Sequence, residues 1–269
     1  MIGIGATLFK VPTAYGQGFS PASLFSSGEA GAWYDPSDLT KVFQVDGTTP
    51  TVPWTSGDIL DANRVGKLED KSGNENDLVQ TTLAKCPVLK LAGGLYYLEF
   101  DGVDDGLQSA DINFTGTNTM SVFSGARKEA DEVAVVAELS NNVGGNPGAF
   151  RIASISSNVW RYTSKGTSGV NANATGYTPP VTSVLTGLSD ITNDVNTIRV
   201  DGVEKASSTA NQGDGPYGNW PLNLGARNSG ASLHLDGRVY GLIVRGALSN
   251  PSEIASAETY IAGKTGVSI

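Results

Sequence analysis

Short runs of alternating apolar and polar residues recur along most of the chain. They occupy residues 94–100, 119–127, 132–139, 149–155, 159–164, 181–188, 196–202 and 237–246. Runs of this length, with a period of two and many β-branched or aromatic residues, are typical of strands that bury one face. We expect these strands to form two antiparallel sheets that pack face to face.

Turn residues separate the runs. Asp-Gly pairs stand at 46–47, 101–102, 201–202, 214–215 and 236–237. Asp-Gly is favoured where both central residues of a two-residue hairpin need a positive φ. The pairs therefore predict tight hairpins between consecutive strands, as in an antiparallel meander.

The two ends of the chain follow other patterns. Residues 249–263 predict a short C-terminal helix, because Ser249 or Asn250 can cap it and Pro251 suits its first position. Its apolar stripe consists of Ile254, Ala257 and Ile261. Residues 1–32 show neither a period of 2 nor one of 3.6, which predicts an extended arm ahead of a single domain over 33–269.

The predicted arm carries isolated apolar residues that would be unfavourable in water. They are Ile2, Ile4, Leu8, Phe9, Phe19, Leu24 and Phe25. We expect the same chain or another subunit to cover them.

Composition agrees with an all-β domain and excludes several partners. The chain has 269 residues, 34 of them Gly, and only 17% are charged. A net charge of -9 without any Lys/Arg cluster argues against nucleic acid. The longest apolar run, at 133–137, is far too short for a membrane helix, and the first residues lack the features of a signal peptide.

The stretch 98–107, LEFDGVDDGL, gathers Asp101, Asp104 and Asp105. These carboxylates could supply oxygen ligands to calcium, a hard cation that takes six to eight of them. Alternatively, they accept backbone N–H bonds in a tight turn ahead of a strand. A catalytic pair is the third alternative, although no second acidic motif accompanies the cluster.

Other catalytic arrangements are absent from the sequence. Glu132 and Glu138 on one predicted strand would lie about 20 Å apart at roughly 3.3 Å per residue, well beyond the roughly 5 to 9.5 Å of paired glycosidase carboxylates. His234 is the single histidine, and Cys86 is the single cysteine. We therefore expect no catalytic residues and a protein that is not an enzyme.

Two aromatic stretches are candidates for carbohydrate binding, because sugars stack on aromatic rings and bond to amides and carboxylates. The candidate residues are Trp160 and Tyr162 in one stretch, and Asp214, Tyr217, Asn219 and Trp220 in the other. The alternative is that the rings fill the core or hold a Gly-rich loop. Binding residues concentrate on loops, which favours Trp220.

The order of several motifs resembles concanavalin A-like (laminin G-like) jelly-roll domains. They lie at 33–44, 70–80, 98–107, 198–206, 222–227 and 235–254. The sequence as a whole is similar to proteins encoded among tail genes of bacteriophages and prophages of proteobacteria. The resemblance implies a sandwich of two antiparallel sheets, and some relatives bind calcium near loops like 101–105; no other cofactor is implied.

The resemblance also implies a function. It predicts a non-enzymatic virion structural protein, made in the host cytoplasm, that displays a lectin-like domain for adhesion to host surface glycans. The arm would bind other virion proteins of a tail fibre or head fibre, and a homo-oligomer, commonly a trimer in phage fibres, is expected. A decoration protein without ligand and a polysaccharide depolymerase are the alternatives.

Overall fold

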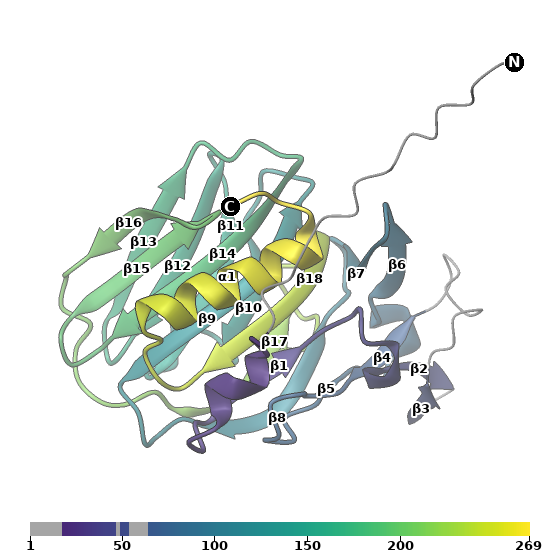
Figure 1. Cartoon of the computed structure of the whole chain (residues 1–269), viewed down its shortest axis with the longest axis horizontal. Helices are drawn as coiled ribbons and strands as arrows, with labels where there is room; N and C mark the ends of the chain where they lie inside the picture. Colours follow the sequence, from purple (N-terminus) through teal and green to yellow (C-terminus); the bar gives the residue numbers. More distant parts are fainter. Residues whose placement is uncertain (1–17, 47–48, 54–63) are drawn as a thin grey trace, which may run out of the picture.

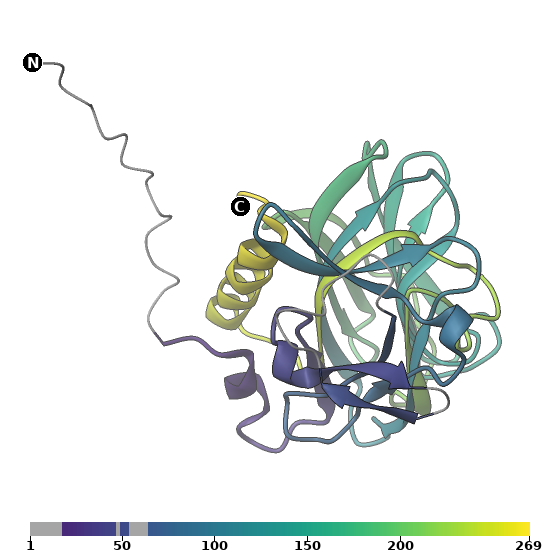
Figure 2. The same ribbon diagram turned by 90° about the vertical axis from the view of Figure 1, so that its right-hand side faces the viewer.

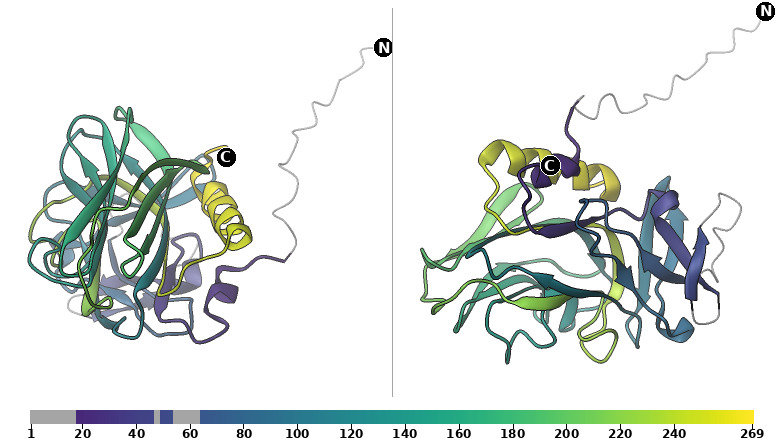
Figure 3. Two further views of the ribbon diagram at one scale, coloured as in Figure 1. Left: turned by 90° about the vertical axis from the view of Figure 1, so that its left-hand side faces the viewer. Right: turned by 90° about the horizontal axis from the view of Figure 1, so that it is seen from below.

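The computed structural model describes residues 18–46, 49–53 and 64–269. Within these ranges, two antiparallel sheets stack face to face, and one α-helix lies outside them (Figures 1 and 3). The predicted sandwich with a C-terminal helix is confirmed. No helix of the described part is long and apolar enough to span a membrane.

Sheet A contains β18 (Asp236–Arg245), the last strand of the chain, and the strands on either side of it. Its order is β16 (Val203–Ser208), β15 (Val195–Val200), β14 (Val181–Asp190), β9 (Thr119–Lys128), β18, β7 (Leu95–Asp101) and β6 (Val88–Ala92). Strand β1 (Gly31–Tyr34) also joins β18: it pairs with residues 242–245, whereas β7 pairs with residues 236–239. Two distant segments thus share one edge of β18.

Sheet B is the longer sheet. Its order is β13 (Gly169–Thr175), β12 (Val159–Lys165), β11 (Ala149–Ile155), β10 (Ala134–Leu139), β17 (Asn219–Leu224), β8 (Leu107–Asn113), β5 (Leu78–Val79), β4 (Val65–Leu68), β2 (Val42–Asp46) and β3 (Thr49–Pro53). Short 3-10 helices lie at η1 (Pro21–Phe25), η2 (Leu39–Lys41) and η3 (Leu83–Lys85). The chain crosses between the sheets from β7 to β8, to β9 and to β10, so only part of the fold is the expected meander.

The main core lies between the sheets. Alternating residues of facing strands fill it, among them Phe100, Phe150, Trp160, Tyr162 and Leu242. A second apolar cluster lies on the outer face of sheet A, where Phe123, Val184 and Ile243 meet the helix.

Helix α1 (Pro251–Thr265) covers this outer face (Figure 2). Asn250 caps it by accepting the backbone N–H groups of Ser252 and Glu253, and Ala257 and Ile261 are buried in the second cluster. The helix runs past the expected end at Gly263 and stops at Gly266, whose φ of 74° gives the left-handed C-cap.

The N-terminal segment corrects the predicted boundary at residue 32. The 3-10 helix η1 packs Leu24 and Phe25 into the second cluster, with Phe19 partly buried beside them. Glu29 forms an ion pair of 2.6 Å with Arg245. Residues 18–32 are therefore part of the folded domain, and the same chain covers these apolar side chains; Ile2, Ile4, Leu8 and Phe9 lie outside the described residues.

The Asp-Gly pairs have different roles. Asp201 and Gly202 form the expected hairpin between β15 and β16, with φ values of 52° and 77°. Asp236 and Gly237 instead lie inside β18. A Cβ on Gly237 would come within 2.1 Å of the Arg127 carbonyl oxygen, so this position requires glycine. Gly237 thus permits close strand approach rather than a turn.

Candidate functional site

The turn of Asp101, Asp104 and Asp105 carries the chain from β7 in sheet A to β8 in sheet B. Asp101 Oδ1 accepts the backbone N–H groups of Val103, at 2.8 Å, and Asp104, at 3.3 Å. Asp105 is 2% exposed; its Oδ1 lies 3.0 Å from Arg64 Nη1, and its Oδ2 accepts the N–H of Asp101. These bonds match the turn alternative.

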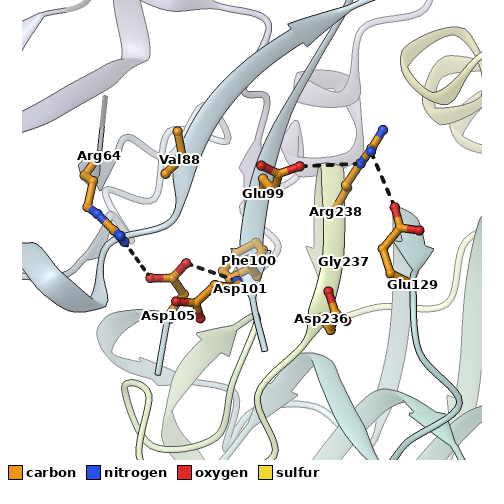
Figure 4. Close-up of a pocket in the computed structure, with 10 residues that line it drawn as sticks. All are labelled: Arg64, Val88, Glu99, Phe100, Asp101, Asp105, Glu129, Asp236, Gly237 and Arg238. Carbon is orange, nitrogen blue, oxygen red and sulfur yellow. Dashed lines mark hydrogen bonds and ion pairs between the residues drawn. The ribbon is translucent and has the colours of Figure 1, made fainter. Parts of the chain in front are cut away.

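A hollow of about 200 Å³ adjoins this turn (Figure 4). It is lined by Arg64, Val88, Glu99, Phe100, Asp101, Asp105, Glu129, Asp236, Gly237 and Arg238. Burial, together with the negative charge of Asp101, raises the pKa of Asp105 to about 7, while Arg64 opposes this rise. Arg238 lies between Glu99 and Glu129, but the lining holds five carboxyl groups and only two guanidinium groups, so acidic groups outnumber basic ones here.

The donor set of this turn does not fit calcium. Carboxylate oxygens of Asp101, Asp104 and Asp105 do lie within 4.8 Å of one another. However, Asp101 Oδ1 and both oxygens of Asp105 already accept N–H donors, and the Arg64 guanidinium places a cation beside Asp105. Too few oxygens remain for an ion that takes six to eight.

Three of the predicted carbohydrate-binding residues are in the core. Trp160, Tyr162 and Tyr217 each have no exposed surface. The hydroxyls of Tyr162 and Tyr217 both bond Ser189 Oγ, at 2.8 and 2.6 Å. These rings offer no face to a ligand, because the alternation of β12 directs residues 160 and 162 inward, as the core-filling alternative stated.

The other three predicted residues keep exposed surface but are not brought together. Trp220 is half-buried, and its Nε1 donates to the carbonyl oxygen of Pro147 at 2.9 Å. Asn219 is exposed at the start of β17. Asp214 is exposed and lines a different hollow, to which neither Asn219 nor Trp220 contributes.

This second hollow, which we call the loop hollow, has a volume of about 240 Å³. It is lined by Asn118, Ile191, Thr192, Asp194, Asn211, Gly213, Asp214 and Gly215. The residues come from the segment before β9, the β14–β15 loop and the loop before β17. Amide, hydroxyl and carboxylate groups therefore converge on a concave surface.

Gln212 holds these loops in place. Its side chain is fully buried, and its Nε2 donates to the carbonyl oxygens of Asp190 and Val195 at 3.1 and 3.0 Å. Its backbone N–H donates to Asp194 Oδ1 at 2.8 Å. Of the lining residues, sequence reasoning selected only Asp214; the signal for the others was the Asn, Asp and Thr content of three turns, which does not reveal that the turns meet.

Comparisons with known proteins give structural matches only. No family model and no curated protein sequence matches the chain. The botulinum neurotoxin serotype D binding domain matches with a TM-score of 0.54 and 9% identity, over 86% of this chain and 52% of that one. The binding domain of botulinum neurotoxin DC in complex with SialylT matches with a TM-score of 0.54 and 11% identity, over 82% of this chain and 52% of that one.

A shorter domain matches along its whole length. Domain 4 of AbnA, a GH43 extracellular arabinanase from Geobacillus stearothermophilus, in complex with arabinotriose, has a TM-score of 0.53 and 14% identity, over 86% of this chain and 100% of that one. The chain shares the fold of these binding domains. It spans about half the length of the toxin domains. These matches confirm the predicted fold, a sandwich of two antiparallel sheets.

Proposed function

We propose that this domain binds carbohydrate and does not cleave it. The loop hollow carries the proposal: it is concave, it is built on loops of a rigid sandwich, and the polar residues Asn118, Asn211 and Asp214 are among those that line it. Amides and carboxylates are suitable partners for sugar hydroxyls. The buried side chain of Gln212 fixes the loops before any ligand binds.

The structural comparisons support this proposal. The arabinanase domain was solved with arabinotriose, and one toxin binding domain was solved in complex with SialylT. Both share the two-sheet sandwich, a fold that holds its loops at the ends of the strands. Because fold alone does not establish function, binding must be measured on this chain.

The geometry of the acidic turn supports a non-enzymatic role. Oxygens of Asp101 and Asp105 approach within 4.8 Å, close to the roughly 5 Å used by retaining glycosidases. However, Asp105 is 2% exposed and ion-paired with Arg64, so a glycosidic oxygen cannot contact it. Incubation with capsular polysaccharide should therefore release no reducing sugar; release would favour the depolymerase alternative.

We further propose that the domain belongs to the virion of a tailed bacteriophage, where it mediates adhesion to host surface polysaccharide as part of a homo-oligomer. The sequence resemblance to phage tail-region proteins supports this setting, and residues 1–17 would contact other virion proteins. Mass spectrometry of purified particles tests it, because the chain should be among the particle proteins. Its absence from particles would contradict the virion assignment.

Glycan-array screening followed by calorimetric titration tests carbohydrate binding. Asp214→Asn should weaken binding of a positive glycan about 10-fold, since a charged hydrogen bond is lost. Asp111→Asn is the matched control, because Asp111 is equally exposed but lies on β8, away from the loop hollow. An array without any positive glycan would favour the decoration-protein alternative.

A further inference from the structure

The outer face of sheet B, away from the core, carries two arginines side by side. The strand register sets Glu138, Arg151, Thr163 and Asn171 in one row across β10 to β13, and Ala153, Arg161 and Asn173 in the next. The intervening residues Ile152, Tyr162 and Ala172 belong to the main core. Strands β11, β12 and β13 lie together at one end of the molecule (Figure 1).

Arg151 lacks a counter-charge of its own. It is half-buried, and its Nε is buried without a hydrogen-bond partner among the described residues. Burial lowers the pKa of Arg151, and the neighbouring charges of Arg227 and Arg161 lower it further, while Glu138 opposes them. Its positive charge is thus held in an unfavourable setting.

Glu138 is already occupied by other donors. Its carboxylate forms an ion pair with Arg227, with Nε at 3.1 and 3.2 Å from the two oxygens. It also accepts the backbone N–H of Val143 at 2.7 Å and the hydroxyl of Ser140 at 3.0 Å. Glu138 thus lies beside two arginines, Arg151 and Arg227, and its single negative charge leaves this group with a net positive charge.

Arg161 is likewise without a carboxylate partner in the described part of the chain. Its Nε donates to Asn173 Oδ1 at 2.7 Å, and burial lowers its pKa. Asn171 Oδ1 accepts the hydroxyl of Thr163 at 2.7 Å. Asn171 and Asn173 are exposed, and with their oxygens engaged, their amide N–H groups remain as donors at the same surface.

We infer that this face, formed by Arg151, Arg161, Asn171 and Asn173, binds the carboxylate of an acidic sugar in a polysaccharide. This inference rests on the proposed carbohydrate binding, adds a binding surface that shares no residue with the loop hollow, and specifies the class of sugar bound there. A guanidinium presents a planar fork that pairs with a carboxylate through two parallel hydrogen bonds, and a ligand anion would repay the desolvation of Arg151. The amides suit the sugar hydroxyls, and two arginines are too few for the several phosphate contacts of a nucleic acid.

Calorimetric titration of the full chain tests the inference with three probes: a short oligogalacturonate, sialyllactose, and a neutral galactan oligosaccharide of matched length. At least one acidic probe should bind about 10-fold more tightly than the neutral one, with an advantage that shrinks as salt is added. A difference in affinity between oligogalacturonate and sialyllactose shows whether this face prefers a uronic acid or a sialic acid.

Arg151→Gln should weaken binding of the acidic probe about 10-fold and leave binding of the neutral probe unchanged. Arg151→Lys should recover only part of the affinity, because an ammonium keeps the charge without the fork. Arg127→Gln is the matched control: Arg127 lies on sheet A in an ion pair with Glu129, and its loss should not change binding.

A stability measurement distinguishes a ligand-binding role from a structural one. Without ligand, Arg151→Gln should melt no lower than the wild type, because the guanidinium has no hydrogen-bond partner to lose.

Equal affinity of the wild type for acidic and neutral probes would overturn this inference alone, since carbohydrate binding itself would stand. Absence of all glycan binding would overturn the proposed function and this inference together, and equally tight binding of inorganic sulfate would overturn the sugar assignment.

Discussion

The hydroxyl of Tyr217 lies 2.6 Å from Ser189 Oγ in the core between the two sheets. Tyr162 bonds the same serine, and Ser164 bonds Tyr217, so four hydroxyls satisfy one another away from water. Because an unsatisfied buried hydroxyl is costly, Tyr217→Phe should lower the free energy of unfolding by about 1 to 3 kcal/mol in urea denaturation. The half-exposed Tyr96→Phe is the control and should change it by less than about 0.5 kcal/mol.

Gln212 should couple stability to ligand binding. Gln212→Ala removes two hydrogen bonds to the carbonyl oxygens of Asp190 and Val195 and leaves these groups unsatisfied. We expect the free energy of unfolding to fall by about 2 kcal/mol or more, and the affinity of the loop hollow for glycan to fall with it. A variant that loses stability but binds glycan normally would show that the loops hold their arrangement without this side chain.

Asp105 should make stability depend on pH. Its pKa is raised from 3.8 to about 7, chiefly by burial, so the folded protein holds this proton more tightly than the unfolded chain. The stabilisation is complete below about pH 4 and is lost as the pH rises through about 7. Asp105→Asn should remove this pH dependence, so the free energy of unfolding of the wild type should fall relative to that of the variant as the pH rises from about 4 to about 7. If the two free energies of unfolding, measured by urea denaturation, differed by the same amount at every pH, the raised pKa of Asp105 would be contradicted.

The N-terminal helix η1 should contribute to the stability of the domain. Leu24→Ala empties a site that is 1% exposed and should lower the free energy of unfolding by about 2 to 5 kcal/mol. Ser27→Ala, on the exposed turn that follows, is the control and should have little effect. Equal stability of the two variants would mean that residues 18–30 do not pack as the structure shows.

Calcium should not stabilise the protein through the acidic turn. Arg64 already provides a positive charge 3.0 Å from Asp105, and the turn hydrogen bonds occupy further oxygens. The melting temperature should therefore be the same in calcium and in a chelator. If calcium raised the melting temperature of the wild type but not that of Asp104→Asn, the turn would have to rearrange around the ion.

Local patterns were sufficient to predict several strands, among them β9, β14 and β18, and the C-terminal helix, but they missed others such as β8 and β13. Alternation with a period of two reports that a strand has one buried face, and the cap at Asn250 with Pro251 marks a helix start, because both signals depend on neighbours in the chain. The hairpin at Asp201 and Gly202 was predictable for the same reason. The sequence by itself therefore determined the all-β class and the C-terminal helix.

Tertiary structure alone decided which face of each strand is buried and which loops meet. Trp160 and Tyr162 are core residues while Arg161 between them is outside, a choice that depends on the opposite sheet. Gly237 serves strand packing rather than a turn because of the Arg127 carbonyl on a distant strand. The loop hollow and the net positive charge around Arg151 likewise arise between segments far apart in sequence. Burial and hydrogen bonding there depend on three-dimensional neighbours, which no local pattern records.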